Sequence, residues 1–239
     1  MKTIFALFSL SIAACGTTGP LEPGAGDSLG SGTQTLVVNG TASARPRLTN
    51  AHQASDFDTD FSVRVSLNNA AVTTGTVTIT SLGKTLNLTF NPNSGGQFGR
   101  WEGTANGYDE VYQFDVVSGT DNVQAVRVDG PDIQTFTAPT AGASVDSTMA
   151  NTVTWSRAAP ADIAEIQAGD NGNPLTIDDT GTYSVAPGTL KADRTQSKQN
   201  TIRLIRTNRV TPTGAAAGSQ VAVSVTNEID VVALPNPAL

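Results

Sequence analysis

The sequence contains one cysteine and one histidine among 239 residues, and aromatic side chains make up only 5% of it. Without a second cysteine the chain cannot form an internal disulfide. One histidine and no spare thiol are too few for a structural zinc site or for a nucleophile activated by histidine. Composition permits chemistry by paired carboxylates, but no motif positions such a pair. We therefore expect no cofactor and no enzymatic activity.

Basic residues are also few, with 14 Lys and Arg against 21 Asp and Glu, which gives a net charge of −7. Nucleic-acid binding requires a clustered basic surface, and polybasic binding to anionic lipid requires a run of Lys or Arg. Neither feature occurs in the sequence. The mild negative charge instead suits a soluble surface on an exported protein.

Long helical patterns are absent too, because no window of ten or more residues has apolar residues with a 3.6-residue period. Short runs instead alternate between apolar and polar residues and are separated by turn residues such as Asn106-Gly107. In residues 61–67 every second side chain is apolar, which predicts a strand with one buried face. We predict strands at 35–38, 61–67, 76–81, 85–90, 100–105, 111–117 and 123–129, and then at 133–136, 152–155, 163–168, 182–185, 201–206, 220–225 and 229–234.

The first fifteen residues have the pattern of an export signal. Lys2 supplies a positive charge, and residues 4–14 form an apolar run of eleven residues. As a helix this run would span about 16 Å, roughly half of a hydrocarbon core, so it fits a secretory signal and not a transmembrane helix.

The end of this run, Ile12-Ala13-Ala14-Cys15, resembles the lipobox of bacterial lipoproteins. The resemblance implies cleavage before Cys15, which would then carry a diacylglyceryl group and often a third acyl chain. Several acyl chains give stable anchoring to a membrane. In that family Gly16 favours passage to an outer membrane, if the organism has one. The alternative is an ordinary signal peptide that contains a cysteine.

These patterns predict a signal peptide (1–14), a lipidated Cys15 with a Gly/Pro-rich tether (15–34), and two β-sandwiches (35–130 and 131–239). Within the second, Pro139 and Trp155 resemble the opening of fibronectin-III-like domains, and the later strands resemble bacterial immunoglobulin-like modules. The resemblance implies an all-β fold of two tandem immunoglobulin-like sandwiches. Such sandwiches share a pattern of strands without sharing a function.

Two motifs resemble functional sites. Residues 26–30 spell the GDSL block and the G-x-S-x-G of hydrolases, but they lie in the expected tether, and the only histidine, His52, is not placed as that family requires. Asp56, Asp58 and Asp60 open like an EF-hand loop, but Phe61 and Leu67 replace the required Gly and Glu. A looser calcium site or a solvated loop are the two readings left for these carboxylates.

The tryptophans and tyrosines have structural and binding interpretations. Trp101 and Trp155 could stack on sugars, although a tryptophan in an alternating strand is more often part of a core. Tyr183, after Asp178-Asp179, and Tyr112 are candidates for a tyrosine corner, which is a structural feature. On one strand Arg203 and Arg209 share a face while Arg206 points away, so they form no patch.

The sequence therefore predicts a non-enzymatic protein, exported and anchored in the cell envelope by lipid on Cys15, with an envelope protein as partner. It would be a structural or interaction module. The alternative is a glycan- or peptide-binding module that uses loops near Trp101 and Tyr108, and a hydrolase is the third reading. A buried Trp101 would argue against the binding loops.

Overall fold

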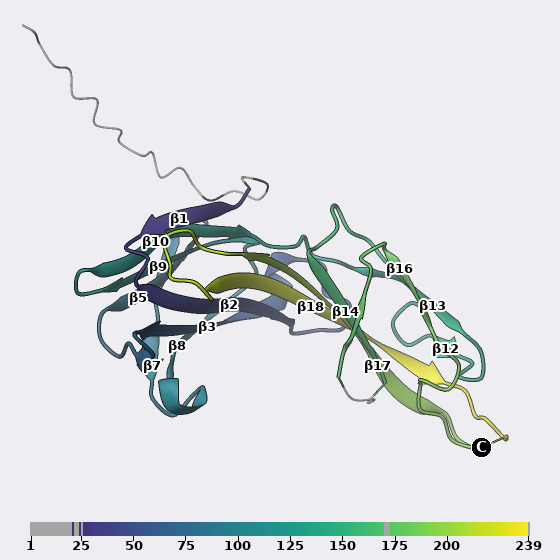
Figure 1. Cartoon of the computed structure of the whole chain (residues 1–239). Coiled ribbons are helices and arrows are strands. Elements are labelled where there is room, and N and C mark those ends of the chain that lie inside the picture. The colour runs from purple at the N-terminus through teal and green to yellow at the C-terminus, as the bar shows by residue number, and fades with distance from the viewer. Residues whose placement is uncertain (1–20, 22–23, 25, 170–172, 239) are drawn as a thin grey trace, which may run out of the picture.

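The computed structural model describes residues 21, 24, 26–169 and 173–238, with the side chain of residue 97 left out. The molecule is elongated and has two lobes, and two long strands pass from one lobe into the other (Figure 1). Apart from two short 3-10 helices, η1 (Ala54–Asp56) and η2 (Gly96–Phe98), the regular structure is all β. The expected all-β sandwich class is confirmed.

The first lobe consists of two facing sheets. One has the strand order β1-β10-β9-β5-β6. Its strands are β1 (Ser28–Gly32), β10 (Asp121–Asp129), β9 (Val111–Ser118), β5 (Thr76–Ser81) and β6 (Lys84–Asn87).

The facing sheet is larger and continues into the second lobe, with the order β15-β14-β17-β18-β2-β3-β8-β7. Its strands are β15 (Leu175–Ile177), β14 (Ile163–Ala168), β17 (Lys198–Val210), β18 (Gln220–Ala233), β2 (Leu36–Pro46), β3 (Phe57–Leu67), β8 (Arg100–Asn106) and β7 (Thr89–Asn91). Two short strands pair with the ends of inner strands: β12 (Ser144–Val145) with the end of β18, and β4 (Ala70–Ala71) with the end of β3. In the second lobe this sheet faces a third one, β11 (Phe136–Ala138), β13 (Asn151–Trp155) and β16 (Thr182–Val185).

Strand β18 belongs to both lobes. Its first half pairs in parallel with β2, from Gln220 opposite Asn39 to Val225 opposite Ala44. Its last residues, Val232 and Ala233, pair with β12 in the second lobe. The chain therefore returns to the first lobe after building much of the second, so the expected division at residue 130 does not separate the two lobes. This return could not be predicted from the sequence, because one sequence does not show which strands pair.

The buried apolar residues form two cores, one in each lobe. The core of the first lobe draws on β2, β3, β9 and β10 and includes Val221, Val223 and Val225 of β18. The core of the second lobe continues along the same strand with Ile229 and Val231. The inward-facing residues of β18 thus contribute first to one core and then to the other, and Asn227 occupies the inward position between them.

The amino-terminal side differs from the expected tether. Residues Ser28–Gly32 form strand β1, which pairs antiparallel with β10 from Ser28 opposite Arg127 to Gly32 opposite Val123. Two of the glycines that suggested a flexible segment, Gly30 and Gly32, are required by close packing. A Cβ on Gly32 would lie 2.3 Å from the carbonyl oxygen of Asn122. The tether predicted to reach residue 34 therefore ends before residue 28.

Candidate functional site

Cys15 and the rest of the expected leader lie outside the described residues. Within the part of the chain that the structure describes, no helix is long and apolar enough to cross a membrane.

The residues of the hydrolase-like motif have structural contacts. Oγ of Ser28 accepts a hydrogen bond from the backbone of Gly30, and Oδ1 of Asp27 accepts one from the backbone of Asp129. The sole histidine, His52, is instead in the loop before η1, where its Nδ1 lies 3.8 Å from Oδ2 of Asp56. Ser28 is thus part of a strand end and not of a strand-to-helix elbow.

The three carboxylates of the calcium candidate have separate partners. Oδ2 of Asp56 accepts hydrogen bonds from the backbone N–H groups of His52 and Gln53, and these lower its pKa. Asp58 and Asp60 lie on the outer face of β3 and pair with Arg47 at 3.7 Å and Arg45 at 3.5 Å. Among the described residues, no three His, Cys, Asp or Glu side chains are grouped so that they could hold a metal ion.

The alternative of binding loops around Trp101 and Tyr108 is not supported, because both are core residues. Trp101 is 6% exposed; its indole N–H donates to the carbonyl of Val72, and its ring packs 5.5 Å from that of Phe90. Tyr108 is 1% exposed, and its hydroxyl donates to the carbonyl of Pro131 at 2.6 Å. Burial raises the pKa of Tyr108 well above its usual value. Neither ring can stack on a ligand in this fold.

A tyrosine corner is present in the first lobe. Tyr112 stands at the start of β9, and its hydroxyl accepts a hydrogen bond from the backbone N–H of Asp109, three residues upstream. Burial raises the pKa of Tyr112 to about 12. In the second lobe the motif around Asp178-Asp179 has another role, because Asp179 binds Arg206.

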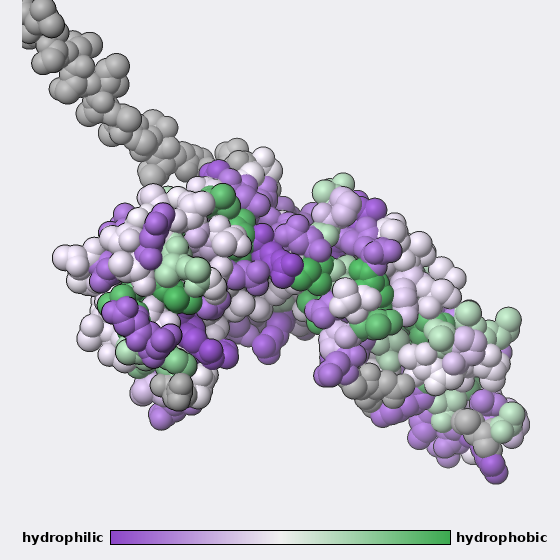
Figure 2. Space-filling view, viewed as in Figure 1, coloured by the Kyte–Doolittle hydropathy of each residue, from purple (hydrophilic) through white to green (hydrophobic). Residues whose placement is uncertain are grey.

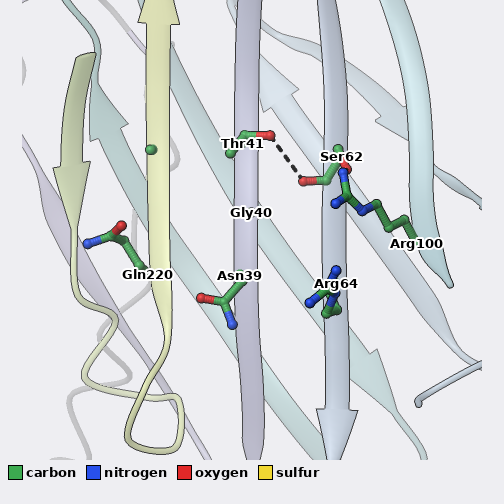
Figure 3. A pocket seen from close by; sticks show the side chains of 8 residues that line it. Asn39, Gly40, Thr41, Ser62, Arg64, Arg100 and Gln220 are labelled. Carbon is green, nitrogen blue, oxygen red and sulfur yellow. Dashed lines mark hydrogen bonds between the residues drawn. The ribbon is translucent and has the colours of Figure 1, made fainter. Parts of the chain in front are cut away.

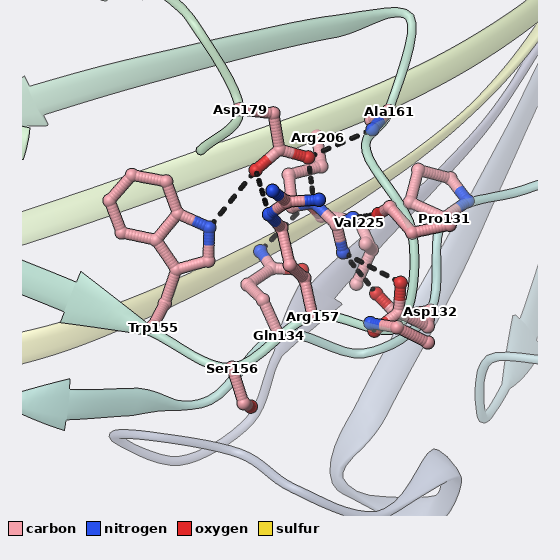
Figure 4. Close-up of polar contacts among 12 residues, drawn as sticks. Pro131, Asp132, Gln134, Trp155, Ser156, Arg157, Ala161, Asp179, Arg206 and Val225 are labelled. Carbon is pink, nitrogen blue, oxygen red and sulfur yellow. Dashed lines mark hydrogen bonds and ion pairs between the residues drawn. The ribbon is translucent and has the colours of Figure 1, made fainter. Parts of the chain in front are cut away.

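Arg206 is the centre of a buried polar network between the two cores (Figure 4). Its side chain is fully enclosed, and its Nε donates to Oδ2 of Asp179 at 2.9 Å. Its Nη1 donates to both the carbonyl and the carboxylate of Asp132, and its Nη2 donates to the carbonyl of Ala159. Asp179 in turn accepts from the indole N–H of Trp155 and the backbone of Ala161. Every charge in this network has a partner, as a buried charge requires.

Two buried amides extend the network. The side chain of Gln134 donates to the carbonyls of Leu204 and Val225, and that of Asn227 donates to the carbonyls of Ala51 and Gln134. Ala51 belongs to the first lobe, so the hydrogen bond from Asn227 connects the loop that contains Ala51 to strand β18. We call Arg206, Asp179, Asp132, Gln134 and Asn227 the interlobe layer.

A cleft of about 360 Å³ opens beside the interlobe layer. Its walls carry four carboxylates, Asp27, Glu110, Asp129 and Asp132. Burial raises the pKa of Glu110, and the negative charges of Asp132 and Asp129 raise it further. These carboxylates are not grouped closely enough to form a metal site within the described residues.

A second depression, of about 260 Å³, lies on the outer face of the large sheet (Figure 3). Asn39, Thr41, Ser62, Arg64, Arg100 and Gln220 line it. They come from four adjacent strands, β18, β2, β3 and β8, and they face away from the core. The hydropathy view shows hydrophobic residues in small groups among polar ones over the visible face of this lobe (Figure 2).

Sequence reasoning missed the interlobe layer, although a signal for it exists. Residues 202, 204 and 206 alternate as Ile, Leu and Arg, so the expected strand already placed Arg206 on the apolar face. Asn227 keeps the same alternation with Val225 and Ile229, although it falls between two expected strands. A polar residue at an inward position of an alternating strand predicts a buried, paired group.

No family model and no curated protein matches the chain. Solved structures do show a likeness. One, from work on host cell surface retention of a 1.5-MDa bacterial ice-binding adhesin, is 18% identical with a TM-score of 0.29, and the match covers 83% of this chain and 66% of that chain. Another, DIP-gamma IG1+IG2, is 10% identical with a TM-score of 0.24, over 80% of this chain and 97% of that one. With TM-scores this low, neither likeness bears on the function.

Proposed function

We propose that this protein is exported, lipidated at Cys15 and held on the cell envelope, with the outer membrane favoured where one exists. There it serves as a non-enzymatic structural or protein-interaction module. The leader and its lipobox-like end support the anchor. The connected two-lobe body supports the structural role.

The observation that carries this proposal is the continuity of β17 and β18 through both lobes. The two strands pair without interruption from Lys198 opposite Ala233 to Val210 opposite Val221. Thirteen residues at about 3.4 Å each extend for roughly 44 Å. Bending the molecule at its waist would break these pairs and expose Arg206. The body is therefore suited to hold its far end at a fixed distance and orientation from the anchor.

The anchor would lie close to the first lobe. Leu21 is buried, and it lies six positions after Cys15. Six residues span at most about 20 Å. Leu21 would thus stand within roughly 20 Å of the membrane, and the carboxyl terminus lies at the tip of the second lobe (Figure 1).

Replacing Cys15 by Ala tests the anchor. The full chain should fractionate with membranes and incorporate labelled palmitate, whereas the C15A chain should do neither. Ser11→Ala, a change within the same leader, serves as the control and should leave both properties unchanged. Membrane association of C15A equal to that of the unaltered chain would refute the lipid anchor.

A crosslinking comparison tests the interaction role. Envelope proteins that are crosslinked to the unaltered chain but not to C15A would identify partners that depend on the anchor. Binding through loops near Trp101 and Tyr108 has no support, since both side chains are buried. Hydrolysis by Ser28 has none either, because its contacts are those of a strand end.

A further inference from the structure

The depression on the outer face of the large sheet carries two guanidinium groups in an acidic protein. Arg64 and Arg100 both line it, while the chain as a whole has a net charge of −7. Two other arginines of this face lie next to carboxylates: Arg45 pairs with Asp60 and Arg47 with Asp58. Neither Arg64 nor Arg100 forms an ion pair with any carboxylate in the described part of the chain.

The nearest acidic side chain on the same strand as Arg100 has other partners. Glu102 accepts hydrogen bonds from Oγ of Ser94 and from Nδ2 of Asn91, at 2.9 Å for the latter. These bonds, with a smaller contribution from the charge of Arg100, lower the pKa of Glu102. The positive charges of Arg64 and Arg100 are therefore only partly compensated.

Arg64 is held in place, and one of its donors is enclosed without a partner. Its Nη2 donates to the carbonyl of Gly95, and its guanidinium lies 5.8 Å from the centre of the Phe98 ring. Its Nε is buried without a hydrogen-bond partner within the described residues. Arg100 reaches across to Ser62, to which its Nη1 donates at 3.3 Å (Figure 3). Fixed guanidinium groups lose less side-chain entropy when they bind an anion.

Four neutral hydrogen-bonding side chains lie beside these arginines, in two rows across the sheet: Gln220, Asn39, Thr41 and Ser62. Gln220, Asn39 and Arg64 stand opposite one another on β18, β2 and β3, and Ala222, Thr41 and Ser62 form the next row. Adjacent strands are about 4.8 Å apart, so the first row offers two neighbouring amides (Gln220 and Asn39) and the second two neighbouring hydroxyls (Thr41 and Ser62). Such groups both donate and accept hydrogen bonds, which matches the hydroxyls of a sugar chain.

A peptide is a poorer fit for the same surface. Strand β2 is paired with β18 on one side and β3 on the other, and β3 is paired with β2 and β8. Their backbone groups are already used, so no peptide strand can be added here. The depression also lacks an apolar pocket for a peptide side chain, because its lining is polar apart from Gly40 and Ala222.

From these observations we infer that this depression binds an anionic polysaccharide, with Arg64 and Arg100 receiving a carboxylate or sulfate group and the amide and hydroxyl rows receiving sugar hydroxyls. This site is independent of the lipid anchor, and it lies on the sheet face and not at the loops near Trp101.

Binding can be measured with the full chain in non-ionic detergent, using fluorescently labelled polygalacturonate and dextran sulfate as probes. The expected result is saturable binding to one of them, which identifies the anionic group, and no binding to neutral dextran. Arg64→Gln with Arg100→Gln should weaken that binding about tenfold or more, since charge-assisted bonds are lost. Lys84→Gln with Arg194→Gln removes the same charge from exposed positions elsewhere and should change it little.

A second variant tests the site without removing the arginines, in case R64Q/R100Q loses binding because it misfolds. Ala222→Glu adds a negative charge to the depression and leaves both arginines intact, and it should abolish binding while the melting temperature stays near that of the unaltered chain. The inference is overturned if neither anionic polymer binds, if the control pair weakens binding as much as R64Q/R100Q, or if polyglutamate competes as well as the polysaccharide.

Discussion

Nε of Arg206 donates to Oδ2 of Asp179 over 2.9 Å, and the two side chains are 0% and 2% exposed. This pair lies where the core of the first lobe ends and that of the second begins. Arg206 lies on β17, one of the two strands that join the lobes, and Asp179 lies in the loop between β15 and β16, so the pair fixes that loop to the joining strand. The pairs on the outer faces, such as Arg203 with Glu228, are largely in contact with solvent.

Replacing Arg206 by Met should destabilise the protein strongly. The substitution keeps much of the side-chain volume but leaves Asp179 buried without its cation. Removing one partner of a buried ion pair costs about 3–5 kcal/mol. The free energy of unfolding, measured by urea denaturation and followed by Trp fluorescence, should fall by that amount.

Arg203→Met is the matched control. Arg203 stands on the same strand, three residues upstream, and its Nε lies 2.6 Å from Glu228, but its side chain is 46% exposed. Exposed ion pairs contribute about 0–1 kcal/mol. Equal losses in R206M and R203M would show that burial of the Arg206 pair is not what stabilises the waist.

Acid should weaken the same contact. Burial alone would raise the pKa of Asp179, but hydrogen bonds from the N–H of Ala161 and from Arg206 outweigh it, so the pKa lies below the usual 3.8. A carboxyl group with a lowered pKa in the folded state contributes stability above about pH 4 that is lost as the pH falls through the folded-state pKa. Asp179→Asn should therefore be less stable than the unaltered chain at pH 7, and this difference in stability should become smaller below about pH 4. Urea midpoints of both chains between pH 3 and 7 measure the difference, and a difference that stays constant over this range would contradict the prediction.

Most of the strands could be predicted from the alternation of apolar and polar residues. Strands β5, β14 and β16 have the bounds that the sequence predicted, because their apolar residues alternate and turn residues flank them. Strand β2 is much longer than expected, since its inward positions after Val38 are Gly40, Ala42 and Ala44, which have little hydrophobic signal. Small residues are needed there, as the ring of Phe114 lies 3.3 Å from the place of a Cβ on Gly40.

A polar residue at an inward position also made the prediction of strands less accurate. Asn227 interrupted an apolar pattern and divided β18 into two expected strands, although the strand is continuous. The depression around Arg64 and Arg100 could not be predicted at all. Those residues are 36 positions apart, and only the pairing of β3 with β8 brings their strands together. Alternation indicates which face a residue occupies, but the neighbour across the sheet depends on pairing.

Glu110 in the interlobe cleft should behave in the opposite way to Asp179. Burial raises its pKa, and Asp132 and Asp129 raise it further. A carboxyl group with a raised pKa destabilises the folded state when it is ionised, so Glu110→Gln should increase stability at pH 7. The gain should vanish below about pH 4, where the group is protonated in both states. Thermal melts at pH 7 and pH 4 measure this gain. Glu165→Gln, at a partly exposed position of β14, is the control for loss of one charge, and a gain of equal size at both pH values would contradict the prediction.

Gly32→Ala tests whether β1 is part of the fold or part of a tether. A Cβ at this position would lie 2.3 Å from the carbonyl oxygen of Asn122 and 2.5 Å from that of Gly214. Both are backbone atoms, so β1 would have to move away from β10, at a cost of about 1–3 kcal/mol. Amide hydrogens along β10 should then exchange faster.

Gly40→Ala provides the comparison for this variant. Its new Cβ would meet the ring of Phe114 at 3.3 Å, and a ring can shift by a few tenths of an ångström where a paired backbone cannot. The expected loss is below about 1 kcal/mol, since one extra methyl group that its neighbours can accommodate costs little. If Gly32→Ala changed neither the stability nor the exchange of β10, the contacts of β1 would contribute nothing to the fold. A larger loss in Gly32→Ala than in Gly40→Ala would place residues 28–32 within the first lobe and confine any tether to the residues before them.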